Sequence, residues 1–283
     1  MTDMADLKSG KTERDENFPV ASVLIAPRFR EPILAFYRFA RAADDVADHA
    51  HLGERDKLAA LDLLEATLLG RTDAARDALP LRHALAGTEL TPRHALDLLT
   101  AFRLDITKRR YRDWSELMHY CRYSAMPVGR FVLDLHGEPR STWPASDALC
   151  AALQVINHMQ DCAKDYRALD RVYLPLDDLA AHGATVEALA MARSSRQLRA
   201  CLTSLAHKTV ELLSDAMKLP YRVTSLRLAA ETAAIVGLAR RLTCLLLTRD
   251  PLSERVHLTK ADAFAVVARS VVWGLIGRVR GRA

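Results

Sequence analysis

The sequence predicts an all-α fold in which helices pack around a central apolar cavity. Three observations carry this prediction: apolar residues recur at helical spacing in long runs, no alternating strand pattern of useful length appears, and leucine and alanine dominate a chain of 283 residues. The 11 glycines and 11 prolines are spread along the whole length, and no Ser/Gly/Pro-rich linker divides it. We therefore expect one helical domain over residues 17–283, after a polar, disordered segment at residues 1–16.

Capping residues and helix breakers bound the predicted helices. A helix over residues 31–50 should stop near Gly53, and a leucine-rich helix over residues 58–69 stops at Gly70. The next helices should cover residues 92–108, with Thr91 as N-cap, and residues 114–135, kinked by Pro127 and Gly129. Beyond a proline-containing loop, helical patterns cover residues 148–167, 186–191, 197–218, 225–247 and 260–276, with a short β-like stretch at residues 171–176.

A polar stripe runs along the first long helix. Tyr37, Arg41, Asp44 and Asp48 fall at i, i+4, i+7 and i+11, so they share one helical face. A core helix should be apolar on that face, whereas this one carries a phenol, a guanidinium and two carboxylates. A single Asp-rich helix is usually a solvated surface, and Asp45, about 100° off the stripe, is expected beside the site or on the surface.

A second stripe repeats the pattern, because Gln154, Asn157, Asp161 and Asp165 fall at i, i+3, i+7 and i+11. Carboxylates of two such stripes facing each other inside a bundle would repel and take up protons unless cations neutralise them. Mg²⁺ fits this role, since it takes hard oxygen ligands and leaves positions for water and phosphate oxygens. Both stripes lack Cys, His and the Glu-x-x-His pattern of di-iron bundles, which argues against Zn²⁺ and a ferritin-like centre.

Metal-bound carboxylates at the mouth of an apolar cavity suit the ionisation of a diphosphate. Metal ions that clamp the diphosphate stabilise it as a leaving group, and the cavity then holds the carbocation left behind. Arg41 and Arg171 are expected to meet diphosphate oxygens, and Tyr37 can donate a hydrogen bond. Tyr120 and Phe131 lie on the kinked helix that should line the cavity, where aromatic faces stabilise a cation.

Composition excludes several other classes of protein. The formal net charge is +5, but no basic stripe with interleaved aromatics points to nucleic acid. The 5 cysteines lack CxxC spacing and lie in apolar helical patterns, which indicates reduced core residues in a cytoplasmic protein. We expect no secretory signal and no membrane-spanning helix. Arg278, Arg280 and Arg282 follow the apolar residues 263–276, so peripheral contact with anionic lipid stays open. The histidines interpreted as structural are His49, His51, His136 and His158.

These residues resemble the squalene/phytoene synthase family of head-to-head prenyl transferases, which have an all-α isoprenoid synthase fold. Residues 39–48 (FARAADDVAD) look like its first Asp-rich motif, and residues 154–165 (QVINHMQDCAKD), continuing to the RVYLP of residues 171–175, look like its second. Residues 120–129 (YCRYSAMPVG) are similar to the Tyr-bearing segment between them. The resemblance is strong over about residues 17–178.

Within this family the sequence most resembles the hydroxysqualene synthases of bacterial hopanoid pathways. Residues 17–22 (NFPVAS), residues 127–130 (PVGR) and Gln160, which stands before Asp161 where condensing members usually carry Arg, are the basis. The resemblance implies that presqualene diphosphate is ionised, that the cation rearranges, and that water captures it as hydroxysqualene. No reductant is needed for this reaction.

The resemblance and the stripes together define the expected site. Asp44, Asp48, Asn157, Asp161 and Asp165 would hold Mg²⁺, and Tyr37, Arg41, Gln154, Asn157 and Arg171 would surround the diphosphate. Tyr120 would steer the cation, and its phenol would either donate to the departing diphosphate or orient the capturing water. Enzymes upstream and downstream in squalene synthesis are the implied partners. Two alternatives stay open: condensation of two prenyl diphosphates to presqualene diphosphate or phytoene, and a non-catalytic helical scaffold at the membrane.

Overall fold

The computed structural model describes residues 25–280, apart from the side chains of residues 275, 276 and 278–280. The helices are α1 (Pro27–Asp48), α2 (Glu54–Leu68), α3 (Leu79–Ala86), α4 (Arg93–Thr107), α5 (Trp114–Ser124), α6 (Met126–Leu135), α7 (Trp143–Leu169), α8 (Leu176–Ala181), α9 (Arg196–Ala216), α10 (Leu219–Arg222), α11 (Leu226–Thr248) and α12 (Lys260–Arg280). Short 3₁₀ turns cover Arg76–Ala78, Arg140–Thr142 and Val186–Ala190.

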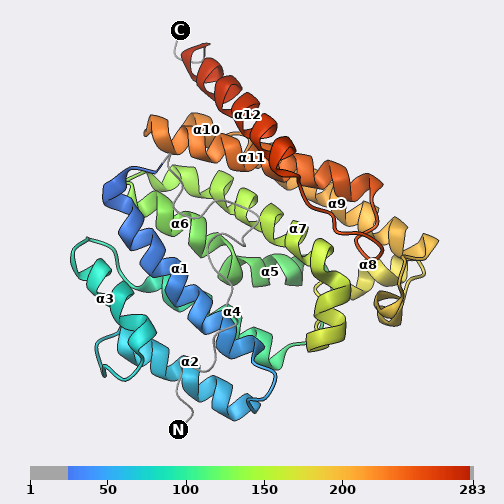
Figure 1. Ribbon diagram of the computed structural model, residues 1–283, viewed down its shortest axis with the longest axis horizontal. Coiled ribbons are helices and arrows are strands. Elements are labelled where there is room, and N and C mark those ends of the chain that lie inside the picture. The colour runs from blue at the N-terminus through green and yellow to red at the C-terminus, as the bar shows by residue number, and fades with distance from the viewer. Residues whose placement is uncertain (1–24, 281–283) are drawn as a thin grey trace.

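The helices form three groups in space. Figure 1 shows α1 to α4 on one side, α9 to α12 on the other, and α5, α6 and α7 between them. The close packing of α1 on α4, and of α7 on both α6 and α9, agrees with this view. Within residues 25–280 the backbone forms no β-strand, only an isolated bridge between Arg110 and Val172. The predicted all-α fold is therefore confirmed, while the β-like stretch at residues 171–176 is not a strand.

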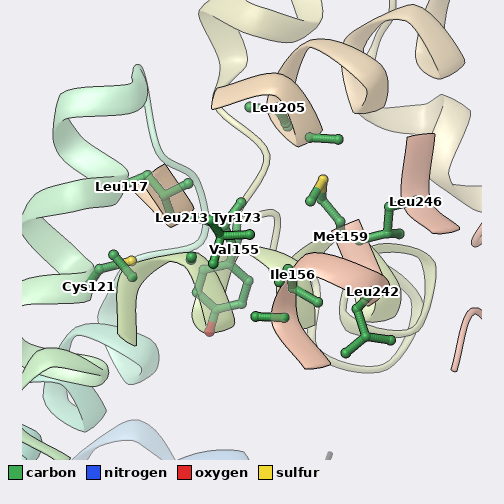
Figure 2. Packing of buried hydrophobic residues seen from close by; sticks show 14 of the residues in the cluster. Leu117, Cys121, Val155, Ile156, Met159, Tyr173, Leu205, Leu213, Leu242 and Leu246 are labelled. Atoms are coloured by element: carbon green, nitrogen blue, oxygen red, sulfur yellow. The ribbon is translucent and has the colours of Figure 1, made fainter. Parts of the chain in front are cut away.

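Two apolar clusters hold these groups together. The larger joins α5, α7, α9 and α11, and Figure 2 shows part of it, with Val155, Ile156 and Met159 of α7 among leucines of the neighbouring helices. The smaller joins α1 to α4, and Phe131 of α6 belongs to it. Phe131 stacks on Phe36 of α1 with ring centroids 4.1 Å apart. The site described below lies where the two clusters meet.

The predicted kinked helix is in fact two helices. The chain breaks at Ala125 (φ −127°, ψ −46°), and Pro127 lies in the first turn of α6. In the first turn of a helix the backbone N–H has no partner within the helix, so a proline, which lacks this N–H, loses no hydrogen bond. Pro127 is therefore better suited to begin a helix than to lie inside one. Gly129 lies inside α6, where a Cβ would come within 2.3 Å of the Ser146 Oγ on α7. The absence of that Cβ lets α6 and α7 approach closely.

Helix boundaries also depart from the sequence predictions. Both α1 and α7 begin earlier than expected, because Pro27 and Pro144 lie in their first turns instead of in loops. Helix α4 starts after Pro92 without the expected Thr91 cap, and α3 was not predicted. Among the cysteines, all of which are free, Cys244 is exposed, so it is not a core residue.

Some predictions concern residues outside this description. The expected disorder of residues 1–16 and the basic Arg282 lie there, and so do the side chains of Arg278 and Arg280. Of the helices within residues 25–280, none is both long and apolar enough to cross a membrane.

Candidate active site

One cavity gathers both predicted stripes. Its volume is about 690 Å³, and all ten predicted site residues line it: Tyr37, Arg41, Asp44, Asp48, Tyr120, Gln154, Asn157, Asp161, Asp165 and Arg171. The arrangement follows from the helical spacing, since α1 and α7 each bury an apolar face in the core and turn the polar stripe towards the other helix. On α1, for example, Phe39, Ala43 and Val46 are fully or almost fully buried while the stripe residues are half-buried.

Arg41 is held by acidic neighbours on its own helix. Its Nη2 lies 3.0 Å from an Asp44 oxygen and 2.8 Å from the Asp45 Oδ1, which also accepts from Nε. These are i,i+3 and i,i+4 pairs, the spacings at which helical side chains meet. Asp45 is only 7% exposed and lines the cavity, so of the two predicted locations it takes the one beside the site.

The carboxylates of the two stripes influence each other. Burial raises the pKa of Asp44 to about 7, and the nearby Asp48 carboxylate adds to this effect. Burial likewise raises the pKa of Asp165 to about 7, with Asp161 as the next cause and Asp48 as a further one. Asp48 of α1 thus influences a carboxylate of each stripe, which agrees with the position of both stripes on one cavity.

The end of α7 carries Arg171 back to α1. Asp170 adopts the left-handed conformation (φ 51°), and the Arg171 N–H donates to the Asp165 carbonyl, which closes the helix and turns the chain. The Arg171 guanidinium then lies against Asp48, with 2.5 Å between Nη1 and Oδ1, and donates to the Ala47 carbonyl. This geometry ties the two motifs together and turns a cation towards the cavity.

Asp105 of α4, which no sequence pattern marks, lies at the same cavity. Asp105 is 5% exposed and accepts hydrogen bonds from the hydroxyls of Tyr120 (2.8 Å) and Tyr173 (2.6 Å). Burial raises its pKa to about 6, although Arg171 and both phenols favour the charged form. Because a phenol has one proton, the O–H of Tyr120 donates to Asp105 in this arrangement and does not donate to a diphosphate, whereas its ring and the acceptor side of its oxygen stay available to the cavity.

His158 also lines the cavity, although the sequence suggested only a structural role. Its ring stacks on Tyr173 at 3.7 Å between centroids, and burial lowers its pKa to about 3. The imidazole is therefore neutral at physiological pH. A signal was available, because His158 follows Gln154 by four residues and precedes Asp161 by three, spacings that put it next to the stripe.

Gln160 does not line the cavity. Its side-chain amide donates to the carbonyl of Val256, 2.5 Å away, in the segment that precedes α12. Lys164 also lines the cavity, at its exposed edge. Gln160, on which the resemblance to hydroxysqualene synthases partly rests, therefore contacts the segment before α12 and does not face the carboxylate cavity.

A second, apolar cavity of about 360 Å³ continues from the first. The two share the residues Tyr37, Ala40, Ser124, Gln154 and Asn157. Beyond this shared collar the walls are mainly apolar, with Phe36, Phe131 and Leu153 among them. The arrangement thus offers charged oxygens at one end and space for a hydrocarbon at the other, as the sequence predicted.

The donor set suits a hard cation that needs few protein ligands. The stripes present carboxylate and amide oxygens, and mutual repulsion of the carboxylates is what a divalent cation would relieve. Within residues 25–280, no three His, Cys, Asp or Glu side chains converge closely enough to hold a metal by themselves. Mg²⁺ commonly keeps several waters and takes further oxygens from a bound phosphate group, so the residues present fit it.

Several known proteins have sequences similar to this one, among them hydroxysqualene synthases and phytoene synthases. A model of the squalene/phytoene synthase family matches residues 11–262. The hydroxysqualene synthase of Rhodopseudomonas palustris is 60% identical over 98% of this chain and 97% of its own length. The hydroxysqualene synthase of Sinorhizobium fredii is 55% identical over 93% of this chain and 90% of its own length.

Solved structures show the same arrangement of helices. Squalene synthase HpnC from Alicyclobacillus acidocaldarius gives a TM-score of 0.69 at 33% identity, covering 85% of this chain and 93% of that one. A dehydrosqualene synthase gives 0.80 over 95% of each chain; at 20% identity this likeness concerns the fold alone.

A helical bundle with opposed Asp-rich stripes at the mouth of an apolar cavity defines an enzyme of the isoprenoid synthase fold. The family match and the relatives then identify the branch. The chain belongs to the squalene/phytoene synthase family, which confirms the resemblance found in the sequence.

Proposed function

We propose that the protein converts presqualene diphosphate to hydroxysqualene in a Mg²⁺-dependent reaction. The observation that supports this most is the continuity of the two cavities, because the substrate has a diphosphate at one end and a long hydrocarbon at the other. The two hydroxysqualene synthases that share 55–60% of its residues support the choice of reaction. The reaction is ionisation of the diphosphate, rearrangement of the cation and capture by water.

Each stripe has a part in this proposal. Asp44, Asp48, Asp161 and Asp165, supported by Asn157, hold Mg²⁺, whose charge stabilises the departing diphosphate when it is bound. Other residues surround the diphosphate oxygens: Tyr37, Arg41, Gln154, Asn157 and Arg171.

Tyr120 steers the cation with its ring in this proposal. Its hydroxyl is bound by Asp105, so the electron-rich ring face is the part that can stabilise positive charge in the cavity. The Asp105 carboxylate between Tyr120 and Tyr173 fixes both rings, which also stand 5.3 Å apart between centroids.

Product analysis tests the proposed reaction. Purified protein with Mg²⁺ is incubated with presqualene diphosphate in one series and with farnesyl diphosphate alone in the other. We expect hydroxysqualene in the first series and no turnover in the second. Consumption of farnesyl diphosphate alone would instead support condensation of two prenyl diphosphates. Failure of both substrates, in protein that folds, would favour the non-catalytic scaffold.

We also propose that the protein works in the cytoplasm at a membrane surface. Phe264, Val272 and Trp273 on α12 are 76%, 55% and 62% exposed, and arginines of α11 and α12, Arg240, Arg241 and Arg269, line the adjacent groove. Apolar side chains beside cations suit an anionic lipid surface, where the enzymes that supply presqualene diphosphate and consume hydroxysqualene would be neighbours. Flotation with vesicles containing phosphatidylglycerol tests this: binding should fall in Phe264→Ser and Trp273→Ser, and equal binding would refute it.

A further inference from the structure

The apolar cavity contains one acidic residue, Glu231. On α11, Leu228, Glu231, Thr232 and Ile235 fall at i, i+3, i+4 and i+7, and all four line the cavity. Glu231 is 4% exposed, and no other Asp, Glu, Lys or Arg is found among the described residues of this wall. The other three residues of this face are leucine, threonine and isoleucine, so Glu231 places the only ionisable group of the four on a mainly apolar surface.

A buried carboxyl group in such a wall is costly. Moving a carboxyl group from water to an apolar cavity disfavours folding, and a leucine at this position would avoid that penalty. Groups buried at such a cost are concentrated at functional sites. The diphosphate end of the site does not account for Glu231, because it does not line the cavity of the Asp-rich stripes.

The proposed reaction needs a group inside the apolar cavity that accepts a proton, and none of the carboxylates of the two stripes lines that cavity. After ionisation a carbocation lies in the apolar cavity, and a water must reach it there and then lose a proton. Thr232 cannot take that proton, since its hydroxyl donates to the Leu228 carbonyl at 2.8 Å and a hydroxyl is a weak base. The hydroxyl of Ser146, which also lines the cavity, is likewise a weak base. A carboxylate can both accept a hydrogen bond from the water and take its proton.

We infer that Glu231 binds the capturing water in the apolar cavity and accepts its proton. The water oxygen forms the new C–O bond to the cation, one of its O–H bonds breaks, and that proton passes to a Glu231 oxygen, leaving the neutral alcohol. Glu231 returns the proton to solvent when the product leaves. The negative charge also holds the positive charge near this wall, which favours capture there over loss of a proton to give a hydrocarbon. This inference rests on the proposed function.

The test measures two quantities in each variant: the rate of diphosphate release and the ratio of alcohol to hydrocarbon among the products. Wild type, Glu231→Gln and Glu211→Gln, an exposed carboxyl on α9 that serves as control, are given presqualene diphosphate and Mg²⁺ in H₂¹⁸O. Diphosphate release and the ratio of ¹⁸O-labelled hydroxysqualene to hydrocarbon are measured. We expect Glu231→Gln to release diphosphate within about threefold of wild type and to lower the ratio by at least about tenfold, while Glu211→Gln matches wild type. Glu231→Asp, which keeps the carboxyl group, should recover part of the ratio.

Each other outcome is informative. If wild type forms the alcohol and Glu231→Gln forms it in the same proportion, the inference is overturned and the proposed function stands. An equal fall in diphosphate release and alcohol would mean a structural role and would also overturn it. If Glu231→Gln does not fold, Glu231→Met takes its place, because apolar replacements of buried charges are often tolerated. If wild type forms no alcohol, the proposed function fails and takes the inference with it.

Discussion

Arg171 and Asp48 form an ion pair between the two Asp-rich motifs, 123 residues apart in the chain. The Arg171 side chain is 7% exposed, whereas Asp48 is 38% exposed at the cavity mouth. The same guanidinium donates to the Ala47 carbonyl at the end of α1. One side chain therefore fixes the distance between α1 and the end of α7, and with it the space in which a diphosphate would lie.

Replacing Arg171 by Met should weaken both the fold and the site. The Ala47 carbonyl and the Asp48 carboxylate lose their donor, and because Asp48 is partly solvated we expect a loss of about 1–3 kcal/mol in the free energy of unfolding. Activity should fall by at least about tenfold, since the opposed carboxylates lose a neutralising charge. Urea unfolding and kcat/KM measure the two effects.

Arg249→Met is the matched control for this substitution. Arg249 pairs with Glu254, and both side chains are more than a third exposed, at 36% and 41%. Exposed pairs contribute little to stability, so this variant should unfold and react almost as wild type does. Equal losses in the two variants would show that the Arg171 pair has no special role.

The pKa values of Asp44 and Asp165 predict a dependence on pH. In the metal-free protein both lie at about 7, above the ordinary 3.8, mainly because of burial. A raised carboxyl pKa contributes stability that is complete below pH 4 and is lost as the pH rises through about 7. The lowered pKa of His158 makes the stability rise with pH instead. The effect of Asp44 is therefore isolated by subtracting the stability of Asp44→Asn from that of wild type at each pH.

Asp44→Asn should therefore gain stability relative to wild type as the pH rises from about 4 to about 7. Thermal unfolding in steps across this range measures the difference in Tm. Binding of Mg²⁺ with pyrophosphate requires the deprotonated carboxylates, so calorimetry at pH 6.5 in two buffers of different ionisation enthalpy should detect released protons. A Tm difference that does not change with pH, together with no proton release, would contradict the raised pKa values.

The success of the sequence predictions depended on distance along the chain. Asp44 and Asp48, or Asp161 and Asp165, could be found because their spacing is local and their helices are long. Asp105 could not, since its partners Tyr120 and Tyr173 are 15 and 68 residues away and no repeat marks it.

Three other features could not be predicted from the sequence, because they depend on short elements or on contacts between distant residues. Helix α3 has only 8 residues with a proline in its first turn, too short for periodicity to register. The break at Ala125 depends on how α6 docks on α7 through Gly129, which is a tertiary contact. Gln160 marked the branch of the family, yet its contact with Val256 could not be inferred from any local pattern.

Tyr173→Phe should raise the pKa of Asp105 above about 6. The hydroxyl of Tyr173 donates to Oδ1, and this hydrogen bond favours the charged carboxylate. The loss of one hydrogen bond to a buried charge should also cost about 1–3 kcal/mol of stability. ¹³C NMR of labelled aspartates follows the titration, with Tyr221→Phe, an exposed tyrosine, as control. An unchanged Asp105 titration would mean that the phenol and carboxylate are not bonded in solution.

Asp48→Asn and Asp165→Asn should each lower Mg²⁺-dependent turnover by at least about 100-fold, because a neutral amide is a weaker ligand for Mg²⁺ than a carboxylate. Folding should survive, since each change relieves repulsion among buried carboxylates. Asp215→Asn provides the control, because Asp215 on α9 forms an exposed ion pair with Lys218 and does not line the cavity. Activity measured against Mg²⁺ concentration separates weaker metal binding from a lower maximal rate; intact activity in both variants would support a site elsewhere.

Gly129→Ala should narrow the apolar cavity from the side of α6. The added Cβ would lie 2.3 Å from the Ser146 Oγ and 2.7 Å from the Cys150 Sγ, and all three residues line the cavity. Either both side chains rotate into the cavity or α6 moves away from α7, at a cost of about 1–3 kcal/mol. Gly87→Ala is the control, because a Cβ there comes no closer than 3.8 Å to its nearest neighbour. Thermal unfolding and the KM for substrates of decreasing chain length measure the effect. We expect a lower Tm and a relative preference for the shorter chains in Gly129→Ala alone, whereas the same Tm and chain-length profile in both variants would mean that α6 and α7 are not in close contact.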